Sequence, residues 1–390
     1  VKLGEICERV TSGGTPKANV SSYYNPPTIP WLKTKEVNYC RITETENYIS
    51  EEGLKNSSAK LISPNSVIIA MYGQGDTAGR IAINKIPLAT NQACCNLTID
   101  KSKADYEFIY YQLCTLYDKL VSLKAGAAQP NLNARIIKNL EIIMPSLPIQ
   151  HRIANILSRY DSLIENYQKQ IKLLEEAAQR LYKEWFIDLH FPGHENTNIV
   201  DGVPEGWEKK PISQLGEYLN GFAFKPSDWQ KSGKPIIKIK EMGNGVSNDT
   251  PRNNGERVPA KYLVKAGDLL FSWSATLMVI VWSGEEGWLN QHLFKVTPSK
   301  GIEREFLLQS ISNTIEEFQN LTTGSTMKHI QRNKLDQVFV NVPNDEIMKR
   351  YSSIAEKERT EILHLSSRIR LLSEARDRLL PKLMGGEIKF

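Results

Sequence analysis

The chain has 390 residues, with 49 Lys and Arg against 44 Asp and Glu, a formal net charge of +5. This balance excludes a histone-like polycation, so binding to nucleic acid would require the basic residues to gather on one face. No apolar run approaches the roughly 18 residues of a membrane span, and five cysteines without a C-x-x-C pair argue against a zinc ribbon or disulfide frame and favour a reducing, cytoplasmic location.

Residues 1–144 are predicted to form a first mixed α/β domain. Short β-type runs cover 67–72 and 80–83, and a helix is expected over 106–123. Between the two runs, Gly73–Ala78 fits a loose dinucleotide-binding pattern, but that fingerprint needs a helix next and another strand follows. The pattern therefore favours a hairpin. Val1 is not a start methionine, so we expect that residues precede it in the native chain.

Motifs for catalysis or metal binding are weak in this sequence. Asn25-Pro26-Pro27 invites comparison with amino-methyltransferases, but Thr28 replaces the aromatic residue that would stack on a flipped base. Pro192-Gly193 prevents the helix that would let His190 and His194 share a zinc ion. Walker A and nuclease motifs are also missing, so we predict no catalytic residue and no metal site.

A heptad pattern follows the first domain. The helix is predicted from Pro148 to Asp188, about 60 Å long at 1.5 Å per residue, and Pro192-Gly193 stops it. Apolar residues alternate by three and four, which is typical of a coiled-coil seam. The alternative is one face of an ordinary buried helix. The predicted seam consists of Ile164, Tyr167, Ile171, Leu174, Ala178, Leu181 and Trp185.

The remaining chain repeats this plan. We assign 145–192 to the first long helix, 193–206 to a polar linker, 207–343 to a second mixed α/β domain and 344–390 to a second long helix with a tail. Pro381 is expected to kink or end the second helix before Gly385-Gly386. Two such helices can pack antiparallel and hold one domain at each end. The second seam consists of Ile362, Leu365, Ile369, Leu372, Arg376, Leu379 and Leu383, each 198 residues after its counterpart, with Arg376 in place of Ala178 as a polar layer.

The two globular domains share landmarks as well. Residues 30–36 match 235–241, and looser matches join Leu3-Gly4-Glu5 to Leu215-Gly216-Glu217 and Asn91-Gln92 to Asn290-Gln291. Between these landmarks the sequences differ almost completely. The pseudo-two-fold symmetry of a duplicated chain suits a ligand with two similar halves, and duplex DNA is the leading candidate. A repeated frame with divergent loops suits two modules that are built alike but read different things.

Lysines and amides are the candidate DNA contacts. The pairs Lys33 and Lys35, and Lys238 and Lys240, alternate in strand-like runs and are expected on one sheet face, either contacting phosphates or forming an ordinary solvated face. Amides pair well with adenine. The other candidates are Gln74, Arg80, Asn91, Gln92, Gln129 and Asn131 in the first domain, and Ser272, Ser274, Asn290, Gln291, Thr326, Lys328 and Gln331 in the second. The shared Asn-Gln pair could equally mark a structural turn.

Several motifs together resemble the DNA-specificity subunits of type I restriction–modification systems. They are the doubled Leu-Gly-Glu, Val203–Glu208 before the second domain, Lys183–Asp188 with Phe191–Glu195 closing the first helix, and Arg378–Met384. The resemblance covers nearly the whole chain. It implies an α+β fold with two target-recognition domains, separated by two long helices that form an antiparallel coiled coil.

The resemblance also implies a function and partners. The chain would be a non-catalytic subunit that binds double-stranded DNA and reads an asymmetric, bipartite target, one half per domain. Its partners would be methyltransferase subunits, two by expectation, and restriction–translocation subunits in the full complex. S-adenosylmethionine, ATP and Mg²⁺ are expected in those partners, with no cofactor in this chain. The rivals are a single-chain methyltransferase or nuclease, and a coiled-coil scaffold that does not bind DNA.

Overall fold

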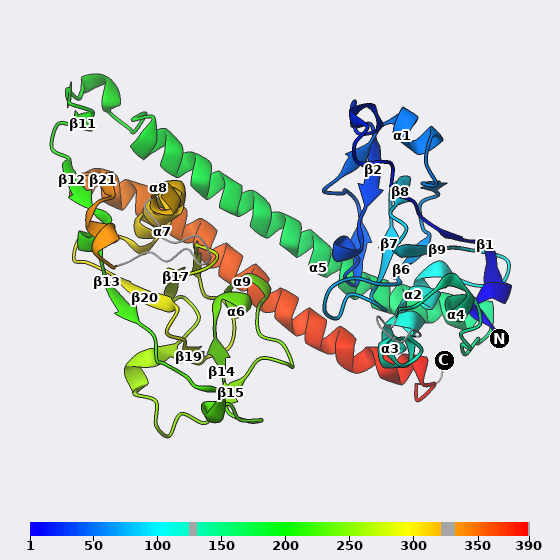
Figure 1. Ribbon diagram of the computed structural model, residues 1–390. Coiled ribbons are helices and arrows are strands. Elements are labelled where there is room, and N and C mark those ends of the chain that lie inside the picture. The colour runs from blue at the N-terminus through cyan, green and yellow to red at the C-terminus, as the bar shows by residue number, and fades with distance from the viewer. Residues whose placement is uncertain (125–130, 321–331, 389–390) are drawn as a thin grey trace. The chain divides into compact units, whose positions relative to one another are not determined.

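The computed structural model describes residues 1–124, 131–320 and 332–388 (Figure 1). The chain divides into two compact units. Unit 1 comprises Val1–Leu163 with Leu372–Phe390, and unit 2 comprises Ile164–Leu371. Each unit therefore contains one mixed α/β module together with parts of both long helices. No helix in the described ranges is long and apolar enough to span a membrane.

Two sheets form the module of unit 1. One has five strands in the order β1-β9-β6-β7-β3, and the other has four in the order β4-β2-β8-β5. The predicted hairpin is confirmed, because β6 and β7 pair antiparallel, and β3 joins the outer edge of β7 in parallel. The strands are β1 (Cys7–Ser12), β2 (Ile29–Leu32), β3 (Cys40–Ile42), β4 (Tyr48–Ile49), β5 (Leu61–Ile62), β6 (Val67–Ala70), β7 (Ile81–Asn84), β8 (Leu88–Thr90) and β9 (Cys94–Ile99).

Short helices flank the two sheets of unit 1. They are α1 (Glu51–Lys55), α2 (Tyr106–Thr115), α3 (Tyr117–Ser122) and α4 (Ala134–Lys138). The single helix expected over 106–123 is therefore two helices, separated at Leu116. Helix α2 begins where the Asp105 carboxylate accepts a hydrogen bond from the Phe108 N–H at 2.9 Å. Its apolar face packs with Leu157 and Leu383 of the long helices in one core.

The module of unit 2 repeats this architecture with one strand fewer in its main sheet. That sheet has the order β13-β20-β17-β18, and the second sheet has the order β15-β14-β19-β16. The strands are β10 (Ile199–Val200), β11 (Val203–Pro204), β12 (Glu208–Pro211), β13 (Gly216–Asn220), β14 (Lys234–Ile237), β15 (Arg252–Asn253), β16 (Leu263–Val264), β17 (Leu269–Ser272), β18 (Met278–Val281), β19 (Gly287–Leu289), β20 (Leu293–Pro298) and β21 (Phe339–Val342). The helices are α6 (Ile239–Asn244), α7 (Arg304–Asn313) and α8 (Ile315–Asn320).

The two long helices are α5 (Leu147–Tyr182), which continues in a π-helical turn to Ile187, and α9 (Asp345–Met384). They run antiparallel within each unit. In unit 2, the Tyr182 ring meets Tyr351 at 6.4 Å between centroids, while Arg368 lies over the Tyr167 ring at 5.9 Å. In unit 1, Arg376 pairs with Asp161 and Leu383 shares a core with Leu157. Higher residue numbers on α5 therefore lie opposite lower residue numbers on α9.

The positions of the predicted seam are buried as a seam requires, and the pairing of the two helices along it stays a prediction. Every seam position of both helices is buried or half-buried, including Ile164, Ile362 and Leu365. By contrast, Leu173 and Leu371 lie off the seam and are 51% and 56% exposed. The polar seam residue Arg376 has a partner, since its Nη1 lies 2.6 Å from Asp161 Oδ1.

Helix α9 continues through Pro381 and ends at Met384, so the expected end before Gly385-Gly386 is confirmed, although Pro381 itself does not end the helix. The proline lies in the last turn, so little of the helix depends on the hydrogen bond that it cannot donate. Its own carbonyl accepts from the Gly385 N–H at 2.8 Å, which keeps the helical pattern beyond the ring.

The hydrogen bonds also correct one match between the halves. The Leu3 N–H donates to Leu140 O at 2.9 Å, and the Ile212 N–H donates to Val338 O at 2.9 Å. Because Val338 lies 198 residues after Leu140, the counterpart of Leu3 is Ile212, not Leu215. The repeated Leu-Gly-Glu is thus a chance identity three residues out of register. The match of 30–36 to 235–241 is confirmed, because β2 and β14 occupy equivalent places in their sheets.

Candidate nucleic-acid interface

The candidate site in each module lies where two parallel strands end. In unit 1 the strands β2 and β8 pair in parallel, and in unit 2 the strands β14 and β19 do the same. Their carboxyl ends therefore meet at one edge of the sheet. The Asn91 N–H closes this edge by donating to Leu32 O at 3.0 Å, and the Asn290 N–H donates to Ile237 O at 3.1 Å. The Asn-Gln pairs thus occupy equivalent structural turns.

The lysines that follow these strands lie on turns, so their predicted alternation on a sheet face was wrong. Lys33 precedes a 3-10 helix over Thr34–Glu36, and Lys238 precedes α6. The Lys33 N–H donates to Glu36 Oε1 and the Lys238 N–H to Glu241 Oε2, both at 3.1 Å. The repeated Lys-x-Lys-Glu pattern is therefore a capped turn, in which the glutamate satisfies an N–H at the start of the helix.

The two lysines of each turn have different surroundings. The first is held over an indole ring: Lys33 Nζ lies 5.1 Å from the Trp31 centroid, and Lys238 Nζ lies 5.3 Å from that of Trp229. Lys33 also donates to Asn47 Oδ1 at 2.9 Å.

The second lysine is exposed and ion-paired in both modules. Lys35 pairs with Glu46 at 2.5 Å, and Lys240 pairs with Asp249. The hydrogen bond from Lys240 is the largest cause that lowers the pKa of Asp249 to about 2. The second lysine of each turn therefore pairs with a carboxylate at the surface, whereas the first lies over an indole ring. The two lysines of one turn are not interchangeable.

A pocket of about 540 Å³ opens beside Lys33 in unit 1. It is lined by Thr15, Ala18, Tyr24, Trp31, Lys33, Asn47, Tyr48 and Asn91. The Thr15 hydroxyl bonds to the Gln92 amide, which brings this candidate to the same edge. Amide, hydroxyl and cationic groups of this kind contact base edges and phosphates.

Three lining residues were not predicted from the sequence, because they lie far from Asn91 along the chain: Thr15, Asn47 and Tyr48 of β4. The glycine at the end of the preceding strand is the sequence feature that could have indicated the loop of Thr15. A side chain at Gly13 would lie 2.2 Å from Thr90 O, and one at Gly221 would lie 2.1 Å from Asn290 O. Glycine therefore lets the preceding loop approach this edge in both modules.

The other candidates are not brought together at this edge. Gln74 is exposed on the β6–β7 hairpin, and Arg80 pairs there with Asp76 at 2.6 Å. Asn131 and Gln291 are half-buried. Gln129, Thr326, Lys328 and Gln331 lie outside the described residues.

Ser272 and Ser274 are unsuitable for contact with DNA because both are buried. The Ser272 hydroxyl accepts from the Met278 N–H at 2.9 Å and donates to Thr276 O, which stabilises the β17–β18 hairpin. Ser274 Oγ lies 3.3 Å from His292 Nδ1. Neither serine is therefore accessible for contact with DNA.

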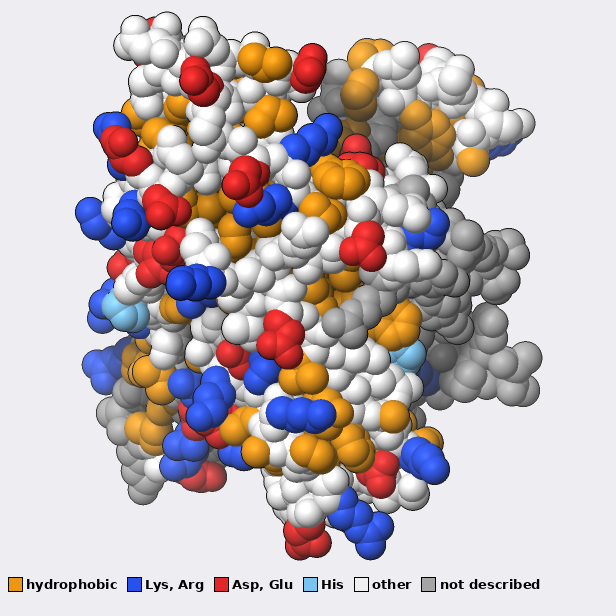
Figure 2. Space-filling view, turned by 90° about the vertical axis from the view of Figure 1, so that its left-hand side faces the viewer, with side chains coloured by type: hydrophobic (Ala, Val, Ile, Leu, Met, Phe, Trp, Pro, Cys, Tyr) orange, Lys and Arg blue, Asp and Glu red, His pale blue; other side chains and the backbone are white. Residues whose placement is uncertain are grey.

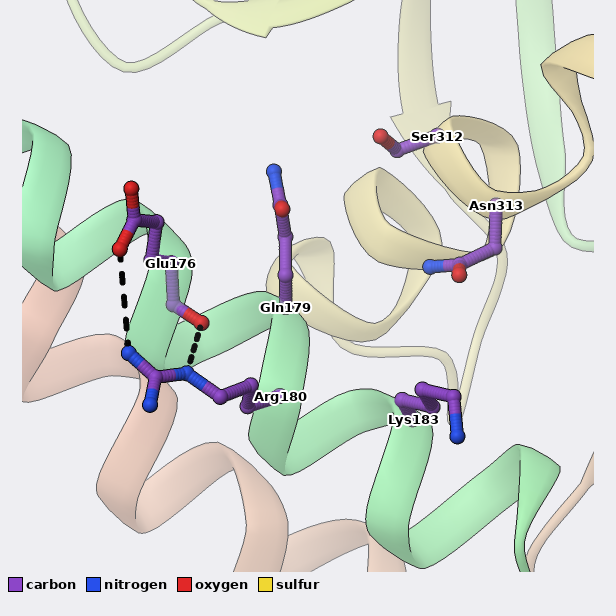
Figure 3. A pocket seen from close by; sticks show the side chains of 6 residues that line it. All are labelled: Glu176, Gln179, Arg180, Lys183, Ser312 and Asn313. Carbon is purple, nitrogen blue, oxygen red and sulfur yellow. Dashed lines mark hydrogen bonds and ion pairs between the residues drawn. The ribbon is translucent and has the colours of Figure 1, made fainter. Parts of the chain in front are cut away.

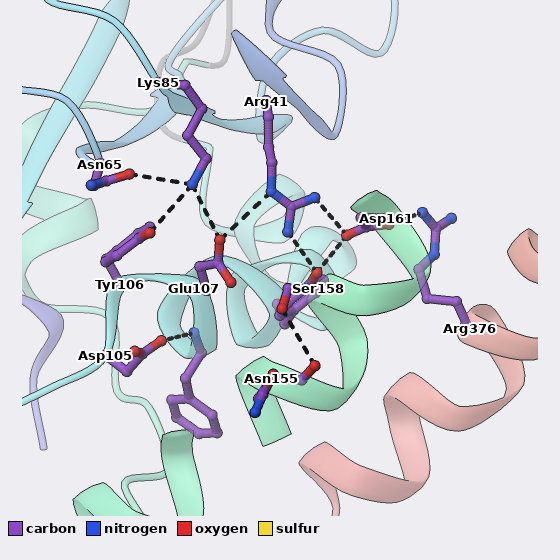
Figure 4. Close-up of polar contacts among 12 residues, drawn as sticks. Arg41, Asn65, Lys85, Asp105, Tyr106, Glu107, Asn155, Ser158, Asp161 and Arg376 are labelled. Carbon is purple, nitrogen blue, oxygen red and sulfur yellow. Dashed lines mark hydrogen bonds and ion pairs between the residues drawn. The ribbon is translucent and has the colours of Figure 1, made fainter. Parts of the chain in front are cut away.

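A buried polar network joins the module of unit 1 to its helices (Figure 4). Arg41 of β3 reaches Asp161 of α5 at 3.0 Å and donates to the Tyr111 hydroxyl at 2.9 Å. Asp161 also holds Arg376 of α9 at 2.6 Å. The side chains of Arg41 and Asp161 are only 6% and 8% exposed, so this network anchors the module through desolvated charges.

The corresponding junction of unit 2 uses the opposite charge on the helix. Arg359 of α9 pairs with Glu305 of α7 at 3.0 Å, and both side chains are buried. Glu305 lies 198 residues after Glu107, and Arg359 lies 198 residues after Asp161. The carboxylate on the module is kept, whereas the helix residue changes from aspartate to arginine. The two modules are therefore attached to their helices by different charge pairs.

An open groove of about 520 Å³ runs between α5 and α7 in unit 2 (Figure 3). Its lining is polar and consists of Glu176, Gln179, Arg180, Lys183, Ser312 and Asn313. Arg180 turns back to Glu176, so much of this charge is neutralised. The face drawn in Figure 2 likewise mixes basic, acidic and apolar side chains instead of gathering the cations into one patch.

Cys7, Cys95 and Cys114 are unsuited to thiolate chemistry. Burial raises the pKa of the Cys7 thiol to about 11 and those of Cys95 and Cys114 to about 12. Such thiols stay protonated at neutral pH and are poor nucleophiles and metal ligands. Within 1–124, 131–320 and 332–388, no three His, Cys, Asp or Glu side chains come together as a metal site.

Comparison with known proteins decides the family. The family model of the type I restriction modification DNA specificity domain matches residues 1–176 and again 204–368. The chain belongs to this family. Its two matches coincide with the two halves of the internal repeat, and family membership identifies a DNA-recognition subunit instead of a catalytic one.

Individual relatives agree with this assignment. The MjaIX type I restriction enzyme specificity subunit of Methanocaldococcus jannaschii is 26% identical, over all of this chain and 93% of its own length. The EcoR124I/EcoR124II specificity subunit of Escherichia coli is 28% identical over 48% of this chain and 47% of its own. The crystal structure of a type I S subunit from M. genitalium has the same fold, with a TM-score of 0.58 and 15% identity over 98% of this chain and 95% of that one.

Proposed function

We propose that this chain reads an asymmetric, bipartite target in double-stranded DNA, with one half read by each module. The observation that carries this proposal is the repeated edge, where a Lys-x-Lys-Glu turn lies beside an Asn-Gln turn. The frame is common to both modules, whereas the loops around it differ in sequence and length. A common frame suits the shared phosphate backbone, and different loops suit different bases.

Exchange of one module tests this proposal. We expect that replacing residues 207–343 with the corresponding module of another specificity subunit changes only one half of the methylated target. The donor should carry a carboxylate at the position of Glu305, because Arg359 would otherwise lose its buried partner. The measurement is the map of methylated adenines in cells that express the chain with its methyltransferase. Changes in both halves would contradict separate reading.

The lysine turns allow a matched test of positioning. Lys33→Ala with Lys238→Ala should weaken binding to all DNA sequences alike and reduce the salt dependence, by a slope of roughly 0.9 for each phosphate that is no longer neutralised. Lys35→Ala with Lys240→Ala is the control, because those lysines are already paired with carboxylates. Binding is measured as a function of salt concentration. A changed target preference with an unchanged slope would instead make Lys33 and Lys238 readers of bases.

The same proposal assigns the chemistry to partner proteins. Methyltransferase subunits would dock on α5 and α9 and bind S-adenosylmethionine, and restriction subunits would use ATP and Mg²⁺. Two methyltransferase docking sites are supported by the repeat on the helix surface. The Glu176–Arg180 pair, part of the groove in Figure 3, returns 198 residues later as the Glu374–Arg378 pair. The mass of the purified complex tests this number, and a single methyltransferase per chain would contradict it.

A further inference from the structure

The main sheets of the two modules differ at one edge. The pairing of Val67 with Ile83 in β6 and β7 corresponds to that of Leu269 with Val281 in β17 and β18. Strand β18 is therefore the counterpart of β7. In unit 1 the outer edge of β7 is covered by β3, but in unit 2 no strand in the described residues covers the outer edge of β18.

The chain of unit 2 uses the corresponding segment differently. After the Lys-x-Lys-Glu turn, α6 continues to Asn244, and the Thr250 N–H then donates to Ser247 O in a tight turn. The chain next enters β15, which pairs with β14. In unit 1 the segment between the equivalent turn and β4 supplies β3 instead. The position of β3 thus has no counterpart from this segment in unit 2.

The backbone of β18 is oriented to accept a strand. The Trp282 N–H donates inward to Asp268 O. Because N–H groups alternate along a strand, those of Val279 and Val281 face away from β17. The side chains show the same difference. All four residues of β7 are buried, whereas Met278, Val279 and Ile280 are only half-buried.

A pocket of about 340 Å³ lies beside this edge. Its lining includes Val279–Ser283, Glu175 and Gln179 of α5, Gln309 and Ser312 of α7, and Arg359 of α9. Gln179 and Ser312 also line the open groove of Figure 3, where they project from α5 and α7. The pocket therefore shares these two lining residues with a surface groove.

The repeat shows what fills the equivalent space in unit 1. There the Arg41 side chain bonds to Tyr111 and Asp161. Their counterparts 198 residues later are Gln309 and Arg359, which both line the pocket. Gln309 is 4% exposed, and its Oε1 has no hydrogen-bond partner in the described part of the chain. A buried acceptor without a donor is costly, so this site favours a ligand that supplies one.

The charge around the pocket favours a cation. Glu175 lies in the lining, and partial desolvation raises its pKa against the effect of Arg359. Arg359 is itself held by Glu305 at 3.0 Å. A second basic group near Glu175 would therefore be stabilised.

We propose that the edge of β18 is a docking site for an extended segment of a partner protein, which adds in parallel as β3 adds to β7. The segment has the pattern apolar–Lys/Arg–apolar, by analogy with Cys40–Ile42. Its two apolar side chains lie beside Ile280 and Trp282, the counterparts of the β7 residues that pair with Cys40 and Ile42 in unit 1. Its basic side chain enters the pocket toward Glu175 and donates to Gln309. Main-chain pairing supplies affinity, and the alternating side chains supply specificity.

A peptide of residues 37–44 of this chain is the direct probe, because it contains β3 with Arg41. Hydrogen exchange of the full-length chain is measured with and without the peptide. We expect saturable protection of the amides over 278–283. Val279→Pro removes an outward N–H and should weaken peptide binding about tenfold, whereas the control Val279→Thr keeps the N–H and should bind as before. Equal binding to both variants would overturn the proposal.

The charge is tested separately at an exposed helix position, where folding is not at risk. Glu175→Lys should weaken binding of the Arg41 peptide, and a peptide carrying Arg41→Glu should prefer the Glu175→Lys chain over the unaltered one. Absence of saturable binding, or protection over 81–84 instead of 278–283, would also overturn the proposal. DNA binding is measured on the same variants and should not change, so failure of this docking site is distinguishable from failure of DNA recognition.

Discussion

Asp161→Ala should lower the free energy of unfolding of unit 1 by about 3–5 kcal/mol, the typical result of removing one partner from a buried ion pair. Asp161 holds Arg41 at 3.0 Å, Arg376 at 2.6 Å and the Tyr111 hydroxyl at 2.5 Å. Its removal leaves two guanidinium groups without their shared anion. Denaturant unfolding, followed by a probe in unit 1, measures the change.

Asp377→Ala is the matched control for this prediction. Asp377 also pairs with Arg376, at 2.8 Å, but its side chain is 63% exposed. Surface pairs contribute about 0–1 kcal/mol, so this substitution should have little effect. The double variant Asp161→Leu with Arg41→Met should recover the part of the lost stability that comes from Arg41, because apolar residues can replace a buried ion pair, while Arg376 still lacks Asp161. Equal stability of Asp161→Ala and Asp377→Ala would mean that the network does not anchor the module.

The sequence predicted features that depend on local patterns. The seam follows from a period of three and four, and residues such as Leu365 are buried as expected. The β6–β7 hairpin follows from two short β-type runs around a glycine-rich turn. The internal repeat predicted which residues of the two modules correspond, because a single shift of 198 residues relates α2 to α7 and α5 to α9.

Features that depend on a change of backbone direction were predicted less well. Lys33 and Lys35 continue the alternation of β2, but the strand ends at Leu32 because Glu36 caps a turn. The repeated Leu-Gly-Glu misled for another reason. An identity of three residues does not define how the two modules align, whereas the backbone hydrogen bonds of Leu3 and Ile212 do.

Long-range pairing was beyond the sequence altogether. Nothing in the spacing of Arg41, Asp161 and Arg376 shows that they meet, since β3, α5 and α9 bring them together only in the folded chain. The burial of Ser272 could not be predicted from the sequence either, because a serine suits both contact with DNA and a structural turn. For such residues, composition gives candidates and the fold decides among them.

Leu365→Asp should be among the most destabilising single substitutions in unit 2. Leu365 lies in the seam of α9 and is 1% exposed. Loss of a buried leucine side chain costs about 2–5 kcal/mol, and a buried carboxylate without a partner adds to that cost. Thermal unfolding and DNA binding of the complex are the measurements, and both should show a severe loss.

Leu371→Asp makes the same chemical change six residues further along the same helix. Leu371 is 56% exposed, so its substitution should change stability by less than about 0.5 kcal/mol, as surface substitutions usually do. The comparison separates burial in the seam from helix propensity, which both variants alter alike. If both variants unfold at the same temperature, the seam contributes no stability to unit 2. If only Leu365→Asp loses DNA binding as well as stability, the packed helices are required to hold the second module in a form that reads its half of the target.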